Sequence, residues 1–370
     1  MKTVCEENKC AGCMACVDIC PKQAIEVKDE LSFYNAEIND KCIECGLCHK
    51  VCPQNNTPEL LKPKEWHQGW AKDEDVRAKG ASGGIATSIA KSFIRNGGVV
   101  YSCYFENGQF RFHKADNEND LVKFAGSKYV KSNPKGIYNE IKQDLKNNQS
   151  VLFIGLPCQV AGLKKSVTDN TEKLYTADLI CHGTPSPKLL NVFLNQYDIS
   201  LGSTKEITFR ANDKRQIWCE NKGLATKGVS DKFTIAYING YIHTENCYEC
   251  NYSKLVRVSD ITLGDSWGSE LYQENSKQGV SLILCQTDKG DELLRDANVE
   301  LREVNLDNAV SNNEQLNHPP VLPEKRKSLL DAIKNGKSFN KQVKKVLPKQ
   351  CIKQNIKAIL IKAKLVKGDN

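Results

Sequence analysis

The chain has 370 residues, 17 of them cysteine, and a formal net charge of +7. No run approaches the ~20 apolar residues that span a bilayer, and the first residues lack the apolar core of a signal peptide. Residues 324–370 hold 14 Lys and Arg against 3 Asp and Glu, so the positive charge is concentrated in the tail. This uneven distribution argues against a protein that binds nucleic acid over its whole length. Tightly clustered cysteines in a reducing, cytoplasmic setting are expected to bind metal.

A cysteine run occurs twice near the start, as CAGCMACVDICP and CIECGLCHKVCP. Three cysteines at steps of three can surround one iron–sulfur cube, and in two-cluster ferredoxins the fourth cysteine of each run binds the other cluster. Structural zinc is the alternative, but zinc sites favour separate CxxC pairs. Cys5 fits neither set and is expected to be a spare thiol. Residues 1–57 are therefore predicted to form a ferredoxin domain with one 4Fe–4S cluster on Cys10, Cys13, Cys16 and Cys52 and another on Cys42, Cys45, Cys48 and Cys20.

The chain beyond this module predicts alternating strands and helices. A polar, proline-bearing linker, residues 54–66, precedes a helix that Ser82 can cap and Gly97–Gly98 can end. A hairpin follows at 99–105 and 108–115, and Pro157 is expected near the first position of a later helix. Further strands are expected at 150–155, 173–183, 205–213, 231–240, 259–267 and 279–287, and further helices at 136–149, 157–167, 186–197 and 289–297. This order predicts an α/β (α+β) layer with some parallel pairing.

Four downstream cysteines stand where chemistry is plausible. Cys158 follows Pro157 at a helix start, Cys181 ends a predicted strand, and Cys247 and Cys250 form a CxxC. Spacing alone leaves three interpretations open: a third 4Fe–4S cluster, buried packing thiols, or a redox pair or half a zinc site in the CxxC. Cysteines in apolar strand-like or helical contexts are expected to be packing thiols, namely Cys103, Cys219, Cys285 and Cys351.

Five stretches in order, SGGIATSIAKSFI, GSKYVKS, LPCQVAGLKK, LICHGTPSPKLL and CYECNYSKLVRVSDITLGDSWG, resemble the coenzyme F-420 hydrogenase/dehydrogenase family of beta subunits over about residues 1–310. The resemblance implies an iron–sulfur flavoprotein with FAD and a cluster held by Cys158, Cys181, Cys247 and Cys250. We therefore expect four parts: the ferredoxin-like domain, residues 58–150 that contact FAD, residues 151–320 that carry the third cluster, and, from its composition, a basic helical tail at 321–370.

The same resemblance places FAD against ASGGIATS and GSKYVKS, with Trp267 in LGDSWG at the border of flavin and cluster. Backbone N–H groups at a helix start can hold a pyrophosphate, and a lysine can face a phosphate or the flavin ring. The dinucleotide fingerprint GxGxxG is absent from this site, so no Rossmann fold is predicted. The predicted cofactor contacts are Ser82, Gly83, Gly84, Thr87, Ser127, Lys128, Gly264 and Asp265.

Three histidines are candidate proton carriers. His182 follows a proposed ligand, so a supporting role beside the cluster is expected, whereas His113 and His243 are expected to be ordinary surface or core residues.

The resulting hypothesis is an enzyme that moves electrons between a hydride carrier, coenzyme F-420 or similar, and a one-electron partner such as ferredoxin or another redox protein. The alternatives are a non-catalytic electron-transfer subunit and a disulfide reductase that uses Cys158 or the Cys247–Cys250 pair. In the tail, Ile352, Ile356 and Ile359 share a helical face with lysines mainly elsewhere. This helix either packs on its own domain or contacts an anionic membrane or an acidic partner.

Overall fold

The computed structural model describes residues 2–211, 214–269, 271 and 278–366. The first part is a small module with two short helices and an antiparallel strand pair: α1 (Ala15–Ile19), α2 (Leu47–Val51), β1 (Ile25–Asp29) and β2 (Tyr34–Ile38). Its two cysteine runs have the same backbone conformation around the second cysteine, because the residues on either side of that cysteine have positive φ in both runs. These residues are Gly12 and Met14 in the first run and Glu44 and Gly46 in the second.

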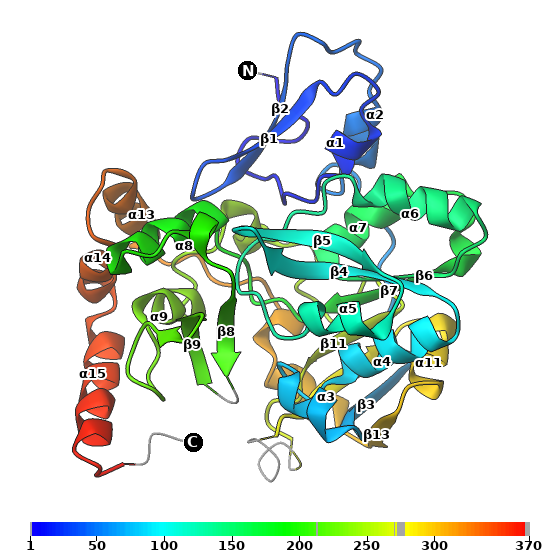
Figure 1. Ribbon diagram of the computed structural model, residues 1–370. Helices are drawn as coiled ribbons and strands as arrows, with labels where there is room; N and C mark the ends of the chain where they lie inside the picture. The colour runs from blue at the N-terminus through cyan, green and yellow to red at the C-terminus, as the bar shows by residue number, and fades with distance from the viewer. Residues whose placement is uncertain (1, 212–213, 270, 272–277, 367–370) are drawn as a thin grey trace.

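The module sits on the rest of the chain at one end of the molecule (Figure 1). Its helix α1 contacts α6 (Ile137–Lys146) and α7 (Pro157–Ser166). The Asp18 carboxylate of α1 accepts hydrogen bonds from the backbone N–H groups of Gly136 (2.8 Å) and Tyr138 (3.3 Å) at the start of α6. A carboxylate at a helix N-terminus satisfies N–H groups that the helix itself leaves unpaired. The module thus supplies the cap of a helix in the larger domain.

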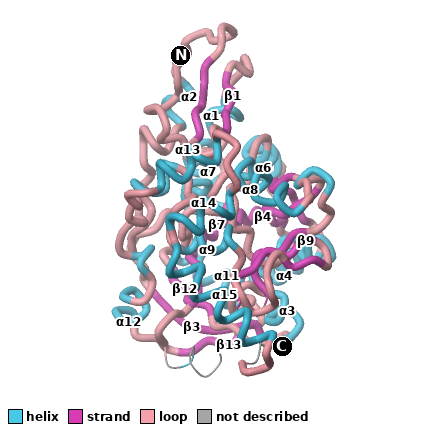
Figure 2. The backbone as a smooth tube through the Cα atoms, turned by 90° about the vertical axis from the view of Figure 1, so that its left-hand side faces the viewer, coloured by secondary structure: helices cyan, strands magenta, loops and turns pink. Residues whose placement is uncertain are grey.

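An eight-stranded mixed sheet forms the centre of the larger domain, in the order β13-β3-β12-β11-β7-β6-β4-β5. Four neighbouring strands are parallel: β4 (Val99–Glu106), β6 (Val151–Gly155), β7 (Leu174–Leu179) and β11 (Ile261–Asp265). The flanking strands pair antiparallel: β3 (Glu65–Ala71), β5 (Gln109–Ala115), β12 (Ser281–Cys285) and β13 (Val299–Arg302). The sheet takes strands from both residues 58–150 and residues 151–320. Figure 2 shows β3 and β13 at the end of the molecule opposite the ferredoxin module.

Helices cover both faces of this sheet. Successive side chains of a strand point to opposite faces, and in β6 Val151 and Phe153 pack with α6 and α7, whereas Leu152 and Ile154 pack with α4 (Ile85–Arg95) and α11 (Asp288–Arg295). The continuous apolar run of β6 follows from this burial on both faces. The result is a mixed α/β protein with an N-terminal ferredoxin-like domain.

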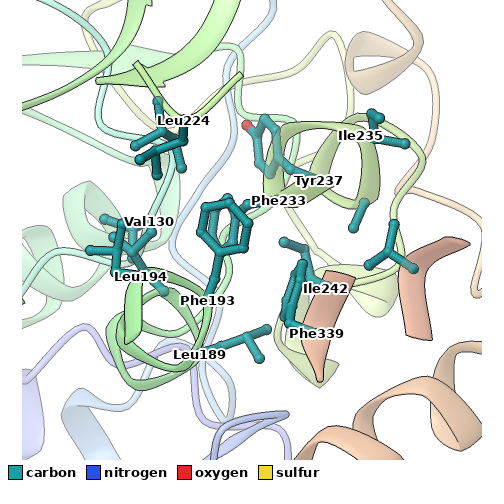
Figure 3. Packing of buried hydrophobic residues seen from close by; sticks show 14 of the residues in the cluster. Val130, Leu189, Phe193, Leu194, Leu224, Phe233, Ile235, Tyr237, Ile242 and Phe339 are labelled. Atoms are coloured by element: carbon teal, nitrogen blue, oxygen red, sulfur yellow. The ribbon is translucent and has the colours of Figure 1, made fainter. Parts of the chain in front are cut away.

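A second core lies beside the sheet, around three short strands: β8 (Ile207–Ala211), β9 (Lys214–Cys219) and β10 (Lys222–Gly223). The Phe193 ring lies 5.5 Å from the Phe233 ring and 5.2 Å from the Phe339 ring (Figure 3). The helices that contribute to it are α8 (Pro187–Leu194), α9 (Lys232–Ile238), α13 (Arg326–Lys334) and α14 (Phe339–Val346).

The remaining elements are short or peripheral. Helix α15 (Pro348–Lys362) runs along the outside of the molecule (Figure 1). No helix in the described ranges is long and apolar enough to cross a bilayer. The other helices are α3 (Glu74–Lys79), α5 (Glu118–Leu121) and α12 (Leu306–Ser311), with 3-10 turns η1 (Val122–Phe124), η2 (Thr171–Lys173), η3 (Asn195–Tyr197), η4 (Leu201–Ser203), η5 (Glu245–Glu249) and η6 (Glu314–Leu316).

Three expectations for the elements were wrong or incomplete. The strand expected at 231–240 is helix α9, which Asp231 caps by accepting from the Thr234 N–H at 2.8 Å. The expected linker ends earlier than predicted, because Glu65 already begins β3. Ser82 is not the cap of α4. The helix begins after Gly84, and the Ser82 hydroxyl donates to the Val280 carbonyl at 2.9 Å instead. The last two residues of the strand expected at 205–213 lie outside the described residues.

Candidate cluster and cofactor sites

The first predicted cluster set lies together inside the ferredoxin module. A small internal cavity is lined by Cys10, Cys13, Cys16 and Cys52, and by Cys5, which lies against Cys10 and Cys52. The fourth cysteine of the second run therefore reaches the first run, as the crossed assignment requires. Cys5, which fits neither cysteine set in the sequence, also borders this cavity.

The second predicted set lies nearer the surface. Burial raises the pKa of Cys48, with Cys20 and Cys42 acting in the same direction, and Cys45 is exposed. Each run directs a backbone N–H at the sulfur of its first cysteine: the Gly12 N–H lies 3.4 Å from Cys10 Sγ, and the Glu44 N–H lies 3.4 Å from Cys42 Sγ. Such bonds favour a thiolate, which is the form that binds iron. The two sets of thiols fit two 4Fe–4S clusters.

The third set converges from three separate segments. Cys158 is the second residue of α7, Cys181 follows β7, and Cys247 and Cys250 belong to or follow η5. Burial raises the pKa of Cys158 to about 12, and it also raises the pKa of Cys181, with Cys247 and Cys250 acting on both in the same direction. Four thiols facing one another fit the ligand chemistry of a cluster. No group of three or more His, Cys, Asp or Glu side chains within the described ranges is drawn together as tightly as a single metal ion requires.

A buried ion pair supports this third set. Arg257 donates to the Asp178 carboxylate at 3.0 Å and to the Leu179 carbonyl at 2.9 Å, both at the end of β7. The same guanidinium donates to the carbonyl of Tyr252, two residues beyond Cys250. The Arg257 side chain therefore ties the CxxC loop to the strand that leads to Cys181.

A cavity of about 360 Å³ opens at the carboxyl ends of the parallel strands. Gly155 of β6, Cys181 after β7 and Gly264 of β11 line it, so its wall includes a member of the third cysteine set. Ligands of open α/β sheets bind at this edge, and the volume lies within the usual range for ligand pockets of about 300–1,000 Å³.

Helix α4 begins at this cavity without a side-chain cap. Gly84 precedes it with a φ of +79°, and a Cβ there would lie 2.9 Å from the Val76 carbonyl oxygen. In the described part of the chain, the backbone N–H groups of Ile85, Ala86 and Thr87 have no hydrogen-bond partner. Free N–H groups and the positive end of a helix dipole suit an anionic ligand. This start fits the pyrophosphate of a dinucleotide such as FAD.

Seven of the eight predicted cofactor contacts line the cavity: Ser82, Gly84, Thr87, Ser127, Lys128, Gly264 and Asp265. Gly83 does not. Its N–H donates to the Ser281 hydroxyl at 2.9 Å, and a Cβ there would lie 2.4 Å from the Gly69 carbonyl oxygen, so this glycine packs against β3 and β12.

Two of these residues are engaged in ways that the sequence did not indicate. The Lys128 ammonium donates to the carbonyls of Phe124 (2.7 Å) and Ala125 (3.0 Å), and burial lowers the pKa of Lys128 to about 8. Asp265 forms a largely buried ion pair with Arg210 at 3.1 Å. Lys128 therefore anchors the loop that borders the cavity, and Asp265 fixes a guanidinium beside it.

The histidines fall in different places. His182 lines the cavity, and its Nε2 lies 3.1 Å from the Ile238 carbonyl oxygen. His243 is fully buried with its ring 5.2 Å from that of His182, neither of its nitrogens has a partner among the described residues, and burial holds the pKa of His243 well below its usual value. His113 stacks on Tyr104 in the outer hairpin.

The cysteines expected to be packing thiols lie in two kinds of environment. Cys219, Cys285 and Cys351 are buried in apolar clusters. Cys103 contributes to an apolar cluster as well, but it lines the cavity beside Lys128, and burial raises the pKa of Cys103 to about 11.

Sequence reasoning also missed a buried lysine beside the cysteine sets. Lys131, in the loop between η1 and α6, is only 4 % exposed. Burial lowers the pKa of Lys131, but the cysteines of two sets, Cys247, Cys158 and Cys181 on one side and Cys10 on the other, raise it overall. A single lysine in the stretch SKYVKSN carries no signal that would have singled it out.

Two family models for the coenzyme F420 hydrogenase/dehydrogenase beta subunit match the chain, the N-terminal model over residues 66–135 and the C-terminal model over residues 148–309. A 4Fe-4S dicluster domain model matches residues 9–56. The chain belongs to the F420 hydrogenase/dehydrogenase family of beta subunits. Its N-terminal part is a 4Fe-4S dicluster domain.

Members of the family with assigned names are similar at low identity. The chain is 26 % identical over 327 residues to the coenzyme F420-dependent sulfite reductase of Methanocaldococcus jannaschii, a match that covers 83 % of this chain and 48 % of that protein. It therefore spans about half the length of that relative. It is 23 % identical over 290 residues to one subunit of the F420H2 dehydrogenase of Methanosarcina mazei, covering 72 % of this chain and 79 % of that one. A chain of the F420-reducing [NiFe] hydrogenase complex from Methanosarcina barkeri superposes with a TM-score of 0.48 at 20 % identity, over 78 % of this chain and 93 % of that chain.

Proposed function

We propose that this chain is an FAD- and iron–sulfur-dependent oxidoreductase that exchanges electrons between a hydride carrier of the coenzyme F420 class and a one-electron partner such as ferredoxin. The names of the relatives supply the substrate class. One structural observation supports the proposal most. The cavity at the strand ends has the unpaired N–H groups of α4 in one wall and Cys181 of the third cysteine set in another.

When bound, FAD supplies the exchange between a two-electron hydride and single electrons, and 4Fe–4S clusters supply one-electron transfer. The chain's own residues would hold these groups. The N-terminus of α4 would receive the pyrophosphate, and Lys128 keeps the loop that carries Ser127 in place. Apolar cavity residues such as Phe112 and Leu263 exclude water. The third set would hold a cluster through Cys158, Cys181, Cys247 and Cys250.

The exposed second set suggests where an external partner would bind. Cys45 is exposed, and the neighbouring apolar side chains Ile43 and Leu47 are 57 % and 39 % exposed. The four cysteines of the first set are buried, and helix α1, which includes one of them, contacts α6 and α7 of the larger domain. A one-electron partner would therefore meet the second cluster first.

The raised pKa values of Cys158 and Cys250 argue against either as the attacking thiol of a disulfide reductase. A reactive cysteine needs a thiolate near neutral pH, which requires a lowered pKa. Burial raises the pKa of Cys158 to about 12 and also raises the pKa of Cys250. These thiols suit metal ligation, in which iron replaces the proton.

We further propose that α15 contacts an anionic membrane surface. Its apolar face is not packed on the chain, because Ile352, Ile356 and Ile359 are 56 %, 52 % and 66 % exposed. Lys353 and Lys357 lie beside this stripe on the same helix. Exposed apolar residues flanked by lysines complement the headgroup region of anionic lipids.

The proposal is tested with protein purified without oxygen. It should be brown, show a flavin spectrum and contain one FAD and about 12 iron atoms, four for each of three clusters. Reduction by reduced coenzyme F420, NADPH or NADH and reduced ferredoxin is then followed in parallel by the visible spectrum. Bleaching by reduced F420 and by ferredoxin is expected. Clusters without flavin would point to a non-catalytic electron-transfer subunit, and zinc in place of iron would overturn the proposal.

A further inference from the structure

Lys131 connects the ferredoxin module to the larger domain. Its Nζ donates to the carbonyl of Ala11, within the first cysteine run, at 3.0 Å. Its stem passes so close to Gly12 that a Cβ there would lie 3.0 Å from Lys131 Cδ. Its own backbone N–H donates to the Pro185 carbonyl at 2.9 Å, four residues after Cys181. One residue thus touches the segments that carry the first and the third cysteine sets.

The ammonium is buried without a carboxylate. Lys131 is 4 % exposed, and no Asp or Glu of the described ranges forms an ion pair with it. The other group near its Nζ is the Tyr34 ring, at 5.4 Å. An isolated buried charge is costly unless a partner of opposite charge compensates it. Cysteines of the two sets act on this charge electrostatically, namely Cys10 of the first set and Cys158, Cys181 and Cys247 of the third.

We propose that Lys131 is a shared counter-charge for the first and the third cluster sites and that it raises the reduction potentials of both. This inference rests on the proposed function, because it requires clusters at both cysteine sets. Lys131 acts as a positioning charge and not as a ligand.

The physical reason is electrostatic. Reduction adds one negative charge to a cluster site, and a fixed positive charge nearby stabilises the reduced form. The interior has a low effective dielectric, so the attraction is stronger than between surface groups and is little screened by salt. Since one ammonium serves both sites, it shifts the two reduction potentials in the same direction.

The test compares Lys131→Met with Lys135→Met in the complete, cluster-loaded chain. Methionine keeps most of the stem and removes the charge, and Lys135 is an exposed lysine four residues away. Anaerobic redox titrations followed by electron paramagnetic resonance give the midpoint of each reduced cluster signal, and iron content is measured on the same samples. In K131M the equilibrium constant for one-electron reduction should fall by about tenfold for two of the three clusters, which is ~59 mV for a one-electron couple. K135M should leave all midpoints unchanged.

Iron content separates this inference from the proposed function. If the wild type holds about 12 iron atoms and K131M keeps them with midpoints equal to those of K135M, the counter-charge role is wrong while the proposed function stands. A wild type without three clusters refutes the proposed function itself, and the inference with it. If K131M does not fold, Lys131→Gln, which can still donate to the Ala11 carbonyl, is titrated in its place against the same two outcomes.

Discussion

Replacing Arg257 by Met tests how the third cysteine set is held. Arg257 is 1 % exposed and donates to Asp178 Oδ1 from Nε at 3.3 Å and from Nη2 at 3.0 Å. Asp178 is fully buried, and its Oδ2 has no partner among the described residues. Methionine fills much of the space of the stem but leaves this carboxylate buried without its counter-charge.

The expected cost follows from that uncompensated charge. Removing one partner of a buried ion pair costs about 3–5 kcal/mol. With an unfolding entropy of about 2.1 cal/mol/K per residue, a cooperative unit of ~250 residues should lose roughly 6–10 °C in Tm. The lost hydrogen bond to the Tyr252 carbonyl should also loosen the loop of Cys247 and Cys250 and lower the iron content.

Thermal unfolding under anaerobic conditions, followed by circular dichroism, measures the effect beside a control. Arg95→Met removes an exposed arginine paired with Glu118 at 2.6 Å. Exposed pairs contribute about 0–1 kcal/mol, so the Tm of R95M should change little. If R257M loses no more than R95M, the reasoning about the buried pair is refuted.

Three further variants test the sites. Cys247→Ser should lower the iron content from about 12 to about 8 per chain, whereas Cys219→Ser, at a buried cysteine of another core, should not. Gly84→Ala should at least halve the bound FAD, because the new Cβ would meet backbone atoms. The control Gly97→Ala has a similar φ of +80° but open space around it, so it should keep FAD and cost only about 1 kcal/mol of stability. Equal FAD content in the two variants would argue against a site at α4. Ile356→Glu should abolish sedimentation with phosphatidylserine-containing vesicles at unchanged iron content, and binding that persists would exclude the apolar face of α15.

The strongest local signals predicted elements well. Pro157 at the first position of α7 and the glycine turn after α4 reflect backbone restrictions that hold in any tertiary context. The strand prediction at helix α9 was wrong because Phe233, Ile235 and Tyr237 alternate with smaller residues. All three are buried, since α9 lies inside the second core, so the alternation does not mark one buried face.

The sites also differ in how far local sequence patterns predict them. The cysteine spacing of the two N-terminal runs carries the crossed arrangement, because the fourth cysteine is fixed relative to its own run. The meeting of Cys158, Cys181, Cys247 and Cys250 depends on the order of the strands in the sheet, so spacing left a third cluster as one of three interpretations and the family resemblance favoured it. A glycine pair does not reveal which glycine faces a ligand, and the partner of Gly83 is a serine 198 residues away.

The capping of α6 by the Asp18 carboxylate of the ferredoxin module has a consequence for folding. Asp18 accepts from the backbone N–H of Gly136, 118 residues later in the chain and directly before α6. Iron–sulfur modules of this size fold around their metal, so a chain that has not received its iron presents α6 with a frayed first turn. Metal delivery to the small module thereby becomes a condition for completing the large one.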